Sequence, residues 1–272
     1  MQFILTALKA ESLPIIDHFN LIRDRTFSFP VFGNDDMMVV GIGVGEAKIQ
    51  NRLEIIHSYY RQEIVQFINI GIAGGNPNST SIGESYFIQK INHKKTGKTY
   101  YPDILIRHPF EEESIITVQN VVKDHVDNYP GLVDMESAEI FRVALRLVKS
   151  HRLAFIKIVS DHMDHHSLNL SRNDISTIVE SHIPKIEAFM LDFKRLKLID
   201  ESILNTEDKI WINNLYSTFN LTETQKYKIT HLSKGFRLRC PDGALPEIIL
   251  STKNTIKDRN QNFHEICDKL SA

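Results

Sequence analysis

Residues 65–75 read Val-Gln-Phe-Ile-Asn-Ile-Gly-Ile-Ala-Gly-Gly, an almost continuous apolar run that ends in glycines. A strand that is apolar at successive positions is buried on both faces, which is typical of a parallel sheet covered by helices on both sides. Further apolar runs of this kind lie at residues 2–8, 37–40 and 153–159. The sequence therefore predicts an α/β protein whose central sheet is mainly parallel.

The segments between these runs have the spacing of amphipathic helices. Within 46–61 the apolar residues recur every three or four positions, and the same spacing appears in 134–148 and in the segment that begins at Asp174. Two further strands are expected at 84–91 and 115–122, where β-forming residues gather. Strands and helices thus alternate along the first 195 residues or so of the chain.

The character of the chain changes near residue 200. Segments 206–215, 221–232 and 255–270 have helical spacing, and Cys-Pro-Asp-Gly at 240–243 is typical of a turn. We therefore predict a first domain of residues 1–198 and a small helical appendage of residues 199–272. The sequence does not disclose the role of the appendage.

The composition is that of a chain that buries a large core. Of the 272 residues, 42% are hydrophobic and 24% are charged, with 32 Lys and Arg against 34 Asp and Glu. This excludes disorder as the dominant state, because disorder requires low hydrophobicity with a large charge imbalance. A formal net charge of −2 also argues against partners held mainly by bulk charge, so we expect no nucleic-acid and no membrane partner.

Cysteine usage and hydropathy narrow the class of protein further. Cys240 and Cys267 are the only cysteines and form no CxxC pair, which excludes a disulfide framework and a cysteine-rich zinc site. No apolar run approaches the roughly 20 residues that a membrane span needs. Lys9 and Glu11 interrupt the first apolar segment too early for a signal peptide, so we expect a cytoplasmic protein.

Glycines and polar residues follow each apolar run where its strand should end. These groups are Lys9-Ala10-Glu11, residues 41–45, residues 71–75 and Ser160-Asp161-His162. Ligands of open α/β sheets bind outside the carboxyl ends of the strands, so we expect these groups to share one rim, with two glycine turns whose backbone approaches a ligand. The glycine spacing at 41–45 matches neither the GxGxxG fingerprint nor a P-loop.

Each group also has a structural interpretation. An aspartate such as Asp161 after a strand is typical of a helix cap, and Glu11 is typical of a first helical turn, where an acid favours the helix dipole. The acids between 134 and 139 fit the same explanation, and glycines after strands are more often turn formers than ligand sites. The combination is more specific than any of its members.

Six short motifs occur in one order along the chain. They are Ala7–Glu11, Gly43–Gly45, Asn69–Gly75, Ile82–Glu84, Val133–Ala138 and Ile158–Asp161. Together they resemble the purine nucleoside phosphorylase and methylthioadenosine/S-adenosylhomocysteine nucleosidase superfamily over about residues 1–195. The resemblance implies a three-layer nucleoside phosphorylase-like sandwich with a central mixed sheet, and cleavage of an N-glycosidic bond without a metal or organic cofactor.

The resemblance also implies roles for individual residues. Asp161 is the expected acid that protonates N7 of a departing purine, assisted by Ser160. Glu136 is expected to bind the ribose 2′-hydroxyl, with Met135 packed on the sugar. Glu11 is expected to orient and deprotonate the attacking water.

Three further residues complete the expected site. Ala73 and Gly74 would line the ribosyl and base site through their backbone. Lys157 stands where the nucleosidases carry an arginine beside the water, so it keeps a cation of different geometry. The implied substrate is a purine nucleoside or thionucleoside, and the implied assembly is a homodimer or larger homo-oligomer.

The sequence favours water over phosphate as the nucleophile. The bacterial phosphorylases place arginines in the early glycine loop and on the strand before Gly71, whereas here residues 41–45 contain no basic residue and Asn69 occupies the strand position. Glu11 would also repel an anion. Phosphorolysis is the alternative reaction, and a catalytically inactive nucleoside or nucleotide sensor is the alternative from a different class.

Two departures from the nucleosidases bear on the substrate. Ile72 stands where they carry a serine, and the segment between Glu84 and Asp134, which normally supplies the aromatic wall around the purine, is shorter. Residues 100–103 and 108–110 are the candidates for a substitute wall.

Other chemistry has weaker support. Contiguous ligands converge poorly on one ion, so residues 161–166 (Asp-His-Met-Asp-His-His) predict a solvated loop rather than a metal site. The serines at 79, 81 and 85 lack a GxSxG setting. Residues 94–101 are basic with adjacent aromatics and predict a solvated hairpin rather than a contact with single-stranded nucleic acid.

Overall fold

The computed structural model describes residues 1–60, 65–123, 126–164, 170–219, 221–241, 243–247 and 256–271. The chain divides into two compact units, Met1–Lys194 and Arg195–Ala272. This division lies inside helix α4 (Arg172–Ser202), a few residues before the boundary expected from the sequence, and the assignment of domains stays a prediction.

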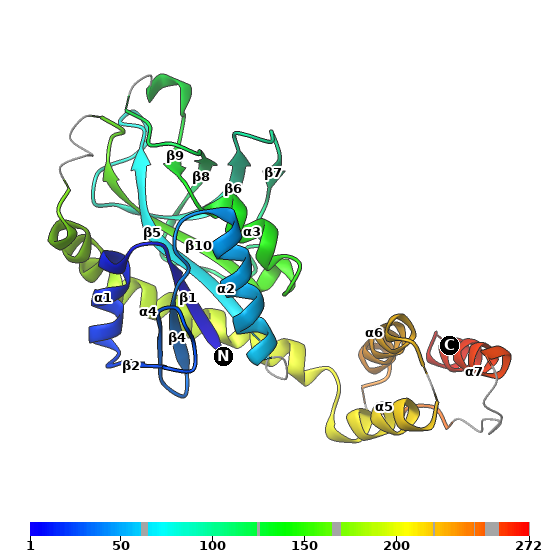
Figure 1. The fold of residues 1–272 in the computed structure, drawn as a ribbon. Helices are drawn as coiled ribbons and strands as arrows, with labels where there is room; N and C mark the ends of the chain where they lie inside the picture. Colours follow the sequence, from blue (N-terminus) through cyan, green and yellow to red (C-terminus); the bar gives the residue numbers. More distant parts are fainter. Residues whose placement is uncertain are drawn as a thin grey trace. The chain divides into compact units, whose positions relative to one another are not determined.

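The N-terminal unit is built on one mixed sheet (Figure 1). Its described strands are β1 (Gln2–Thr6), β2 (Ile22–Arg23), β3 (Val31–Gly33), β4 (Met37–Gly41), β5 (Gln66–Gly75), β6 (Ser85–His93), β7 (Thr99–Tyr100), β8 (Glu111–Thr117), β9 (Leu132–Asp134) and β10 (Leu153–Asp161). The order is β10-β6-β8-β9-β5-β1-β4-β3-β2, and β7 pairs with β6. An additional pairing of β10 with β5 closes β5, β10, β6, β8 and β9 into a ring.

The sheet contains both parallel and antiparallel pairs of strands. Strand β1 is parallel to β4 and β5, and β5 is parallel to β10, as the apolar runs predicted. Strand β8 is parallel to β6 and β9. The pairs β2–β3, β3–β4, β5–β9, β6–β7 and β6–β10 are antiparallel. The sheet is therefore mixed, as the resemblance implied, rather than mainly parallel.

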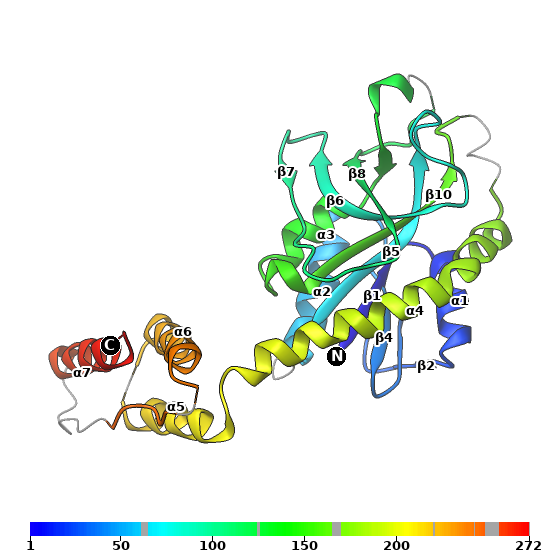
Figure 2. The ribbon, with the colours of Figure 1, turned by 180° about the vertical axis from the view of Figure 1, so that it is seen from behind.

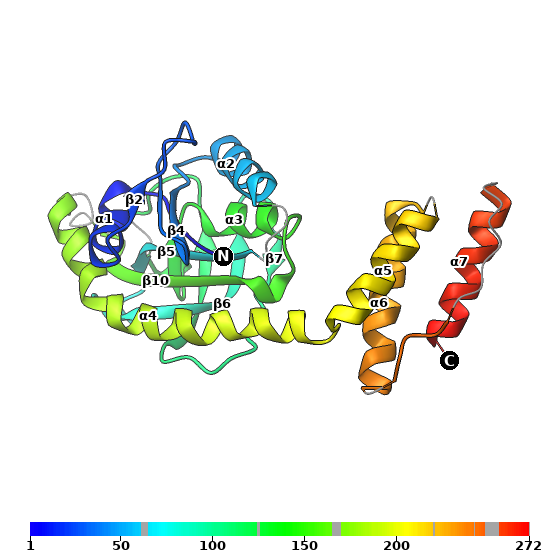
Figure 3. The same ribbon diagram turned by 90° about the horizontal axis from the view of Figure 1, so that it is seen from below.

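Helices cover both faces of the sheet and give the three layers that were expected (Figure 3). Helices α2 (Glu46–Tyr59) and α3 (Ser137–Ala144) lie side by side over one face. Helix α4 runs across the other face, as the view from behind shows (Figure 2), and the Ser176 hydroxyl donates to the Ala10 carbonyl of α1 (Lys9–His18). Two buried glutamines fasten α4 to the sheet, since Gln2 and Gln66 donate to backbone carbonyls of that helix.

The core explains why these segments fold as they do. Ile4 and Leu5 are adjacent on β1 and both are fully buried, because helices pack on both faces of the strand. Ile49, Leu53 and Ile56 form the buried stripe of α2 that the spacing predicted. Each such side chain contributes about 1.5–3 kcal/mol when it leaves water.

Two predicted boundaries were wrong in ways that matter for the site. Residues 71–75 are the second half of β5 rather than a turn, because they pair with β10 and β9. Asp134 ends strand β9, and the helix predicted from 134 to 148 spans only Ser137–Ala144. The hairpin expected at 94–101 is present as the antiparallel pair β6–β7.

The C-terminal unit is helical, as predicted. Helices α5 (Thr206–Thr218), α6 (Glu223–Arg239) and α7 (Ile256–Ser271) contribute to a small core of Leu215, Phe219, Leu221, Ile229, Ile266 and Leu270. None of the helices in the described part of the chain combines the length and apolar character that a bilayer span requires.

Candidate active site

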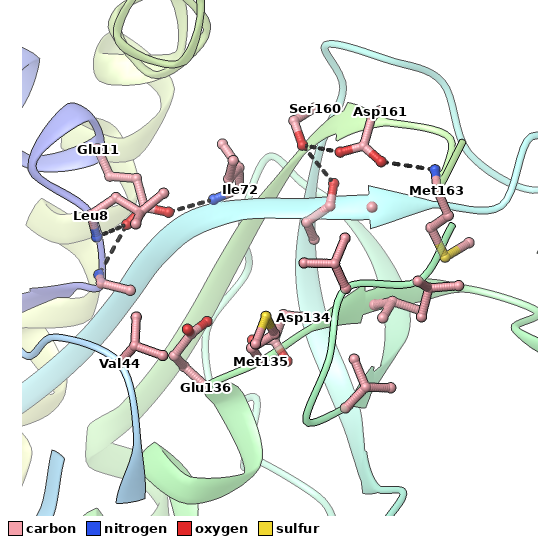
Figure 4. Close-up of a pocket in the computed structure, with 17 residues that line it drawn as sticks. Leu8, Glu11, Val44, Ile72, Asp134, Met135, Glu136, Ser160, Asp161 and Met163 are labelled. Carbon is pink, nitrogen blue, oxygen red and sulfur yellow. Dashed lines mark hydrogen bonds between the residues drawn. The ribbon is translucent and has the colours of Figure 1, made fainter. Parts of the chain in front are cut away.

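A cavity of about 340 Å³ opens at the carboxyl ends of the parallel strands. It lies where β1, β5 and β10 end, the position at which open α/β sheets bind ligands (Figure 4). Its lining consists of Ala7, Leu8, Glu11, Val44, Ile72, Ala73, Gly74, Val118, Val121, Val122, Val133, Asp134, Met135, Glu136, Ser160, Asp161 and Met163.

Glu11 enters the cavity from the first turn of α1 and is held by three backbone amides. One carboxylate oxygen accepts from Ala7 N at 2.9 Å and Leu8 N at 2.8 Å, and the other accepts from Ile72 N at 3.0 Å. Burial raises the pKa of Glu11 although these amides and Lys157 oppose the shift. A carboxylate that is held in a fixed position and has a raised pKa is suited to accepting a proton from water.

Lys157 and Asp134 form a buried ion pair beside the cavity, and Asp134 is one of the residues that line it. The Lys157 Nζ lies 3.0 Å from Asp134 Oδ2, and both side chains are almost fully buried. Burial alone would raise the pKa of Asp134, but the Lys157 charge and the hydroxyls of Ser137 and Thr117 lower it. Burial would likewise lower the pKa of Lys157, but Asp134, Glu136 and Glu11 raise it. The pair is therefore charged in the folded protein.

Glu136 lies at the N-terminal end of α3, just after Met135, and both line the cavity. Burial and the neighbouring Asp134 carboxylate raise the pKa of Glu136 to about 7, although Lys157 opposes the shift. Glu136 therefore changes its charge in the neutral range, which is uncommon for a carboxyl group and is found most often at functional sites.

Ser160 and Asp161 form the other end of the cavity, at the end of β10 (Figure 4). The Ser160 hydroxyl donates to Asp161 Oδ2 at 2.7 Å and lies 3.3 Å from the Ala73 carbonyl oxygen. The Met163 amide donates to Asp161 Oδ1 at 2.8 Å. These contacts orient the Asp161 carboxyl group.

The glycines of β5 make room for this arrangement. A Cβ atom at Gly71 would lie 2.8 Å from Glu11 Oε1, and one at Gly74 would lie 2.6 Å from the Met163 side chain. Glycine is needed here for close approach of side chains to an extended strand, rather than for the turn that we expected.

The structure brings together seven of the eight residues expected at the site. Glu11, Ala73, Gly74, Met135, Glu136, Ser160 and Asp161 all line the cavity. Lys157 is not among the lining residues; its buried ammonium group is turned to Asp134, which does line the cavity. The sequence pattern explains Asp134 as an acid at the start of a helix, whereas the structure pairs it with Lys157.

The wall of the cavity was not found from the sequence. Val118, Val121, Val122 and Met163 form much of it, and aliphatic residues in a loop carry no motif that marks a binding site. The substitute wall proposed at 100–103 and 108–110 was wrong: Tyr100 packs on Phe141, and His108 stacks on Phe87. None of those residues lines the cavity.

The polar segment after Asp161 is described only in part. Asp161, His162, Met163 and Asp164 are described, whereas His165 and His166 lie outside the described residues. Among the residues that the structure covers, no three His, Cys, Asp or Glu side chains are grouped closely enough to hold a metal ion.

Comparison with known proteins supports the fold. No protein-family model matches the chain. No curated protein matches it by sequence. Solved structures do match, at low identity. The 5′-methylthioadenosine/S-adenosylhomocysteine nucleosidase of Streptococcus pneumoniae, with a transition-state inhibitor, is 16% identical with a TM-score of 0.57, covering 72% of this chain and 100% of that chain.

Two other nucleosidases match this chain in structure at similarly low sequence identity. The enzyme from Neisseria meningitidis in complex with methylthio-immucillin-A is 16% identical with a TM-score of 0.58, covering 70% of this chain and 98% of that chain. The enzyme from Chlamydia trachomatis bound to MTA is 18% identical with a TM-score of 0.56, covering 69% of this chain and 97% of that chain. The α/β part of this chain therefore has the nucleoside phosphorylase-like fold that these nucleosidases share.

Proposed function

We propose that this protein hydrolyses the N-glycosidic bond of a purine nucleoside or thionucleoside of the methylthioadenosine/S-adenosylhomocysteine kind. The observation that carries the proposal is that Glu11, Glu136 and Asp161, which are far apart in the sequence, open onto one cavity. The fold shared with nucleosidases, one of which is bound to MTA, supports the same class of substrate.

Cleavage of this bond passes through a sugar with oxocarbenium character and needs acid assistance for the departing base. In the proposed reaction Asp161 donates a proton to N7 of the purine. Ser160 and the Met163 amide hold the Asp161 carboxyl group in place. The base then leaves as a neutral molecule, which lowers the barrier to bond cleavage.

The other two carboxyl groups serve the sugar and the water. Glu136, when ionised, accepts a hydrogen bond from the ribose 2′-hydroxyl and favours the positive charge that develops on the ring, while Met135 packs on the sugar. Glu11 orients a water molecule and takes its proton as the water attacks the anomeric carbon. The three amides that bind Glu11 keep its oxygens in a fixed position.

The charge around the cavity supports water rather than phosphate as the nucleophile. No Lys or Arg side chain of the described residues lines the cavity. Lys157, which lies beneath it, is engaged by Asp134 at 3.0 Å. A phosphate would therefore meet Glu11, Glu136 and Asp161 without a free cation to offset them.

The test is direct. The purified full-length chain is incubated with adenosine, methylthioadenosine and S-adenosylhomocysteine, each with and without phosphate, and free base is measured by chromatography. The proposal expects free base without phosphate. A strict requirement for phosphate indicates a phosphorylase, and tight binding without any release of base indicates a sensor; either result contradicts the proposal.

Assembly and location belong to the same proposal. We propose that the chain acts in the cytoplasm as a homodimer or larger homo-oligomer, by analogy with the superfamily that it resembles. Sedimentation velocity of the purified chain and fractionation of cells that produce it test these two points separately.

A further inference from the structure

The Glu11 carboxylate occupies a space that the bare backbone of Gly71 leaves free, and the Lys157 ammonium group lies next to this space. Lys157 on β10 is in parallel register with Gly71 on β5. A Cβ atom at Gly71 would lie 2.8 Å from Glu11 Oε1 and 3.5 Å from Lys157 Nζ. The ammonium group and the Glu11 carboxylate thus both lie close to the same point of the strand.

Asp134 binds this ammonium group and is itself held by several hydrogen bonds. Its Oδ2 atom accepts from Lys157 Nζ at 3.0 Å and from the backbone and hydroxyl of Ser137 at 2.9 and 2.5 Å. Its Oδ1 atom accepts from the Thr117 hydroxyl at 2.8 Å, and the oxygen of that hydroxyl accepts from Ala138 N at 3.0 Å. Asp134 is therefore fixed to β8, to the start of α3 and to β10.

The local charges do not balance. The charged groups that act on Glu136 are Asp134 beside it, Lys157 on β10 and Glu11 on α1, and Asp161 lines the same cavity. One ammonium group cannot compensate three buried carboxylates, because each uncompensated charge loses its hydration. Burial accordingly raises the pKa of both Glu11 and Glu136.

We propose that Asp134 is a positioning residue, which holds the Lys157 ammonium group close to Glu11 and Glu136, so that the two opposite charges of the pair act together on these two carboxyl groups. The consequence for catalysis rests on the proposed function: Glu136 must be ionised to bind the ribose hydroxyl, and Glu11 must be free to take a proton from water. The positioning itself rests only on the geometry of the ion pair.

Substitutions of Lys157 and of Asp134 should shift the titration of Glu136 in opposite directions. Lys157→Met removes the cation, so Glu136 should hold its proton to higher pH. Asp134→Asn removes the negative charge beside Glu136, so Glu136 should lose its proton at lower pH. A general loss of packing would instead move both variants in the same direction.

The experiment uses the full-length chain with ¹³C-carboxyl-labelled glutamate, and NMR follows the Glu136 signal with pH in the absence of substrate. Glu136→Gln identifies the signal. We expect the midpoint to rise by about one pH unit or more in Lys157→Met and to fall by a similar amount in Asp134→Asn, as charges at this range do. Shifts in the same direction, or no shift in either variant, would overturn the proposal.

A control variant and a conservative variant separate this effect from misfolding. Asp208→Asn, which removes a buried carboxylate from an ion pair in the C-terminal unit, is the matched control and should leave the Glu136 midpoint unchanged. If Asp134→Asn does not fold, Asp134→Glu is used instead. This variant keeps the negative charge, so its Glu136 midpoint should stay close to that of the wild type. A shift of the Glu136 midpoint in Asp134→Glu as large as the shift in Lys157→Met would contradict the proposal.

Failure of the proposed function can be distinguished from failure of the positioning proposal. If no nucleoside releases its base, the hydrolysis proposal fails while the titration still decides the role of Asp134. If base is released, the acidic limb of the pH–rate profile should move to lower pH in Asp134→Asn and to higher pH in Lys157→Met. An active protein whose titration moves but whose profile does not would separate the positioning from catalysis and overturn its proposed consequence.

Discussion

The two compact units each bury an ion pair, and the pairs differ in what surrounds them. In the C-terminal unit, Arg237 binds Asp208 through two nitrogens at 2.5 and 2.9 Å and also donates to the carbonyls of Cys240, Pro241 and Gly243. Asp208 additionally accepts from Asn205 N at the start of α5. This pair has its hydrogen-bonding capacity filled by partners that hold the unit together.

The pair in the N-terminal unit is surrounded by surplus acid. Lys157 is paired with Asp134, which lines the cavity together with Glu11, Glu136 and Asp161. Burial of an ion pair therefore does not by itself indicate function. The candidate site is distinguished by additional carboxyl groups that face a cavity, and by the raised pKa values of two of them, Glu11 and Glu136.

The largest effect is expected at Asp161. Asp161→Asn removes the proposed acid but keeps its size, so release of base should fall by about 10²- to 10⁴-fold while nucleoside still binds. Chromatography measures the first quantity and calorimetry the second. Asp208→Asn should leave the rate of release at the wild-type level, and near-normal activity of Asp161→Asn would show that the acid was wrongly assigned.

The next effect concerns stability of the C-terminal unit. Arg237→Met leaves Asp208 buried without its partner, which should cost about 3–5 kcal/mol of unfolding free energy. Trp211 is the single tryptophan of the chain and packs against the core of this unit, so its fluorescence in a urea titration reports on that unit. An unchanged midpoint would mean that the pair does not stabilise the unit.

Glu136 should make stability depend on pH in the opposite sense from a paired acid. Because its pKa is about 7 in the folded chain and 4.5 as the ordinary value, the folded state binds the proton more tightly. The contribution of Glu136 to the free energy of unfolding is fully present below about pH 4.5. It is lost as pH rises through 7, a change of about 3 kcal/mol. The difference between wild type and Glu136→Gln, measured by calorimetry across this range, should show this loss; a difference that stays constant with pH would contradict it.

Gly71→Ala probes the space between the two charges. Its added methyl group would displace the Glu11 carboxylate, and a displacement of about 1 Å can reduce turnover by about 10²-fold. We expect reduced release of base with the secondary structure retained in circular dichroism. Wild-type turnover would mean that the position of Glu11 is not critical.

The smallest effect is expected outside the cavity. Tyr101 is 64% exposed and does not line the cavity, so Tyr101→Ala should change KM by less than about two-fold. Val118→Ala, in the wall, is its matched counterpart and should raise KM. A larger effect at Tyr101 than at Val118 would place the base-binding wall where the sequence interpretation had put it.

Much of the site could be predicted because its residues sit in local motifs. Glu11 follows one apolar run and Ser160 and Asp161 end another, so strand direction suggested that they meet. Met135 and Glu136 were expected there only because their motif resembles that of the nucleosidase superfamily. The valine wall could not be predicted, because Val118, Val121 and Val122 have no pattern that separates a lining residue from a core residue. The Asp134–Lys157 pair was missed because helix position offered a sufficient explanation for Asp134.

Short-range patterns established the alternation of strands and helices, the parallel centre of the sheet and the order of the motifs, because apolar spacing depends on residues that are neighbours in the chain. Packing decided that residues 71–75 continue as a strand, that β10 pairs with β5, and that Lys157 turns to Asp134. These contacts join segments separated by 20 to 90 residues. Their geometry depends on how buried surfaces and charges are satisfied together, which no local pattern encodes.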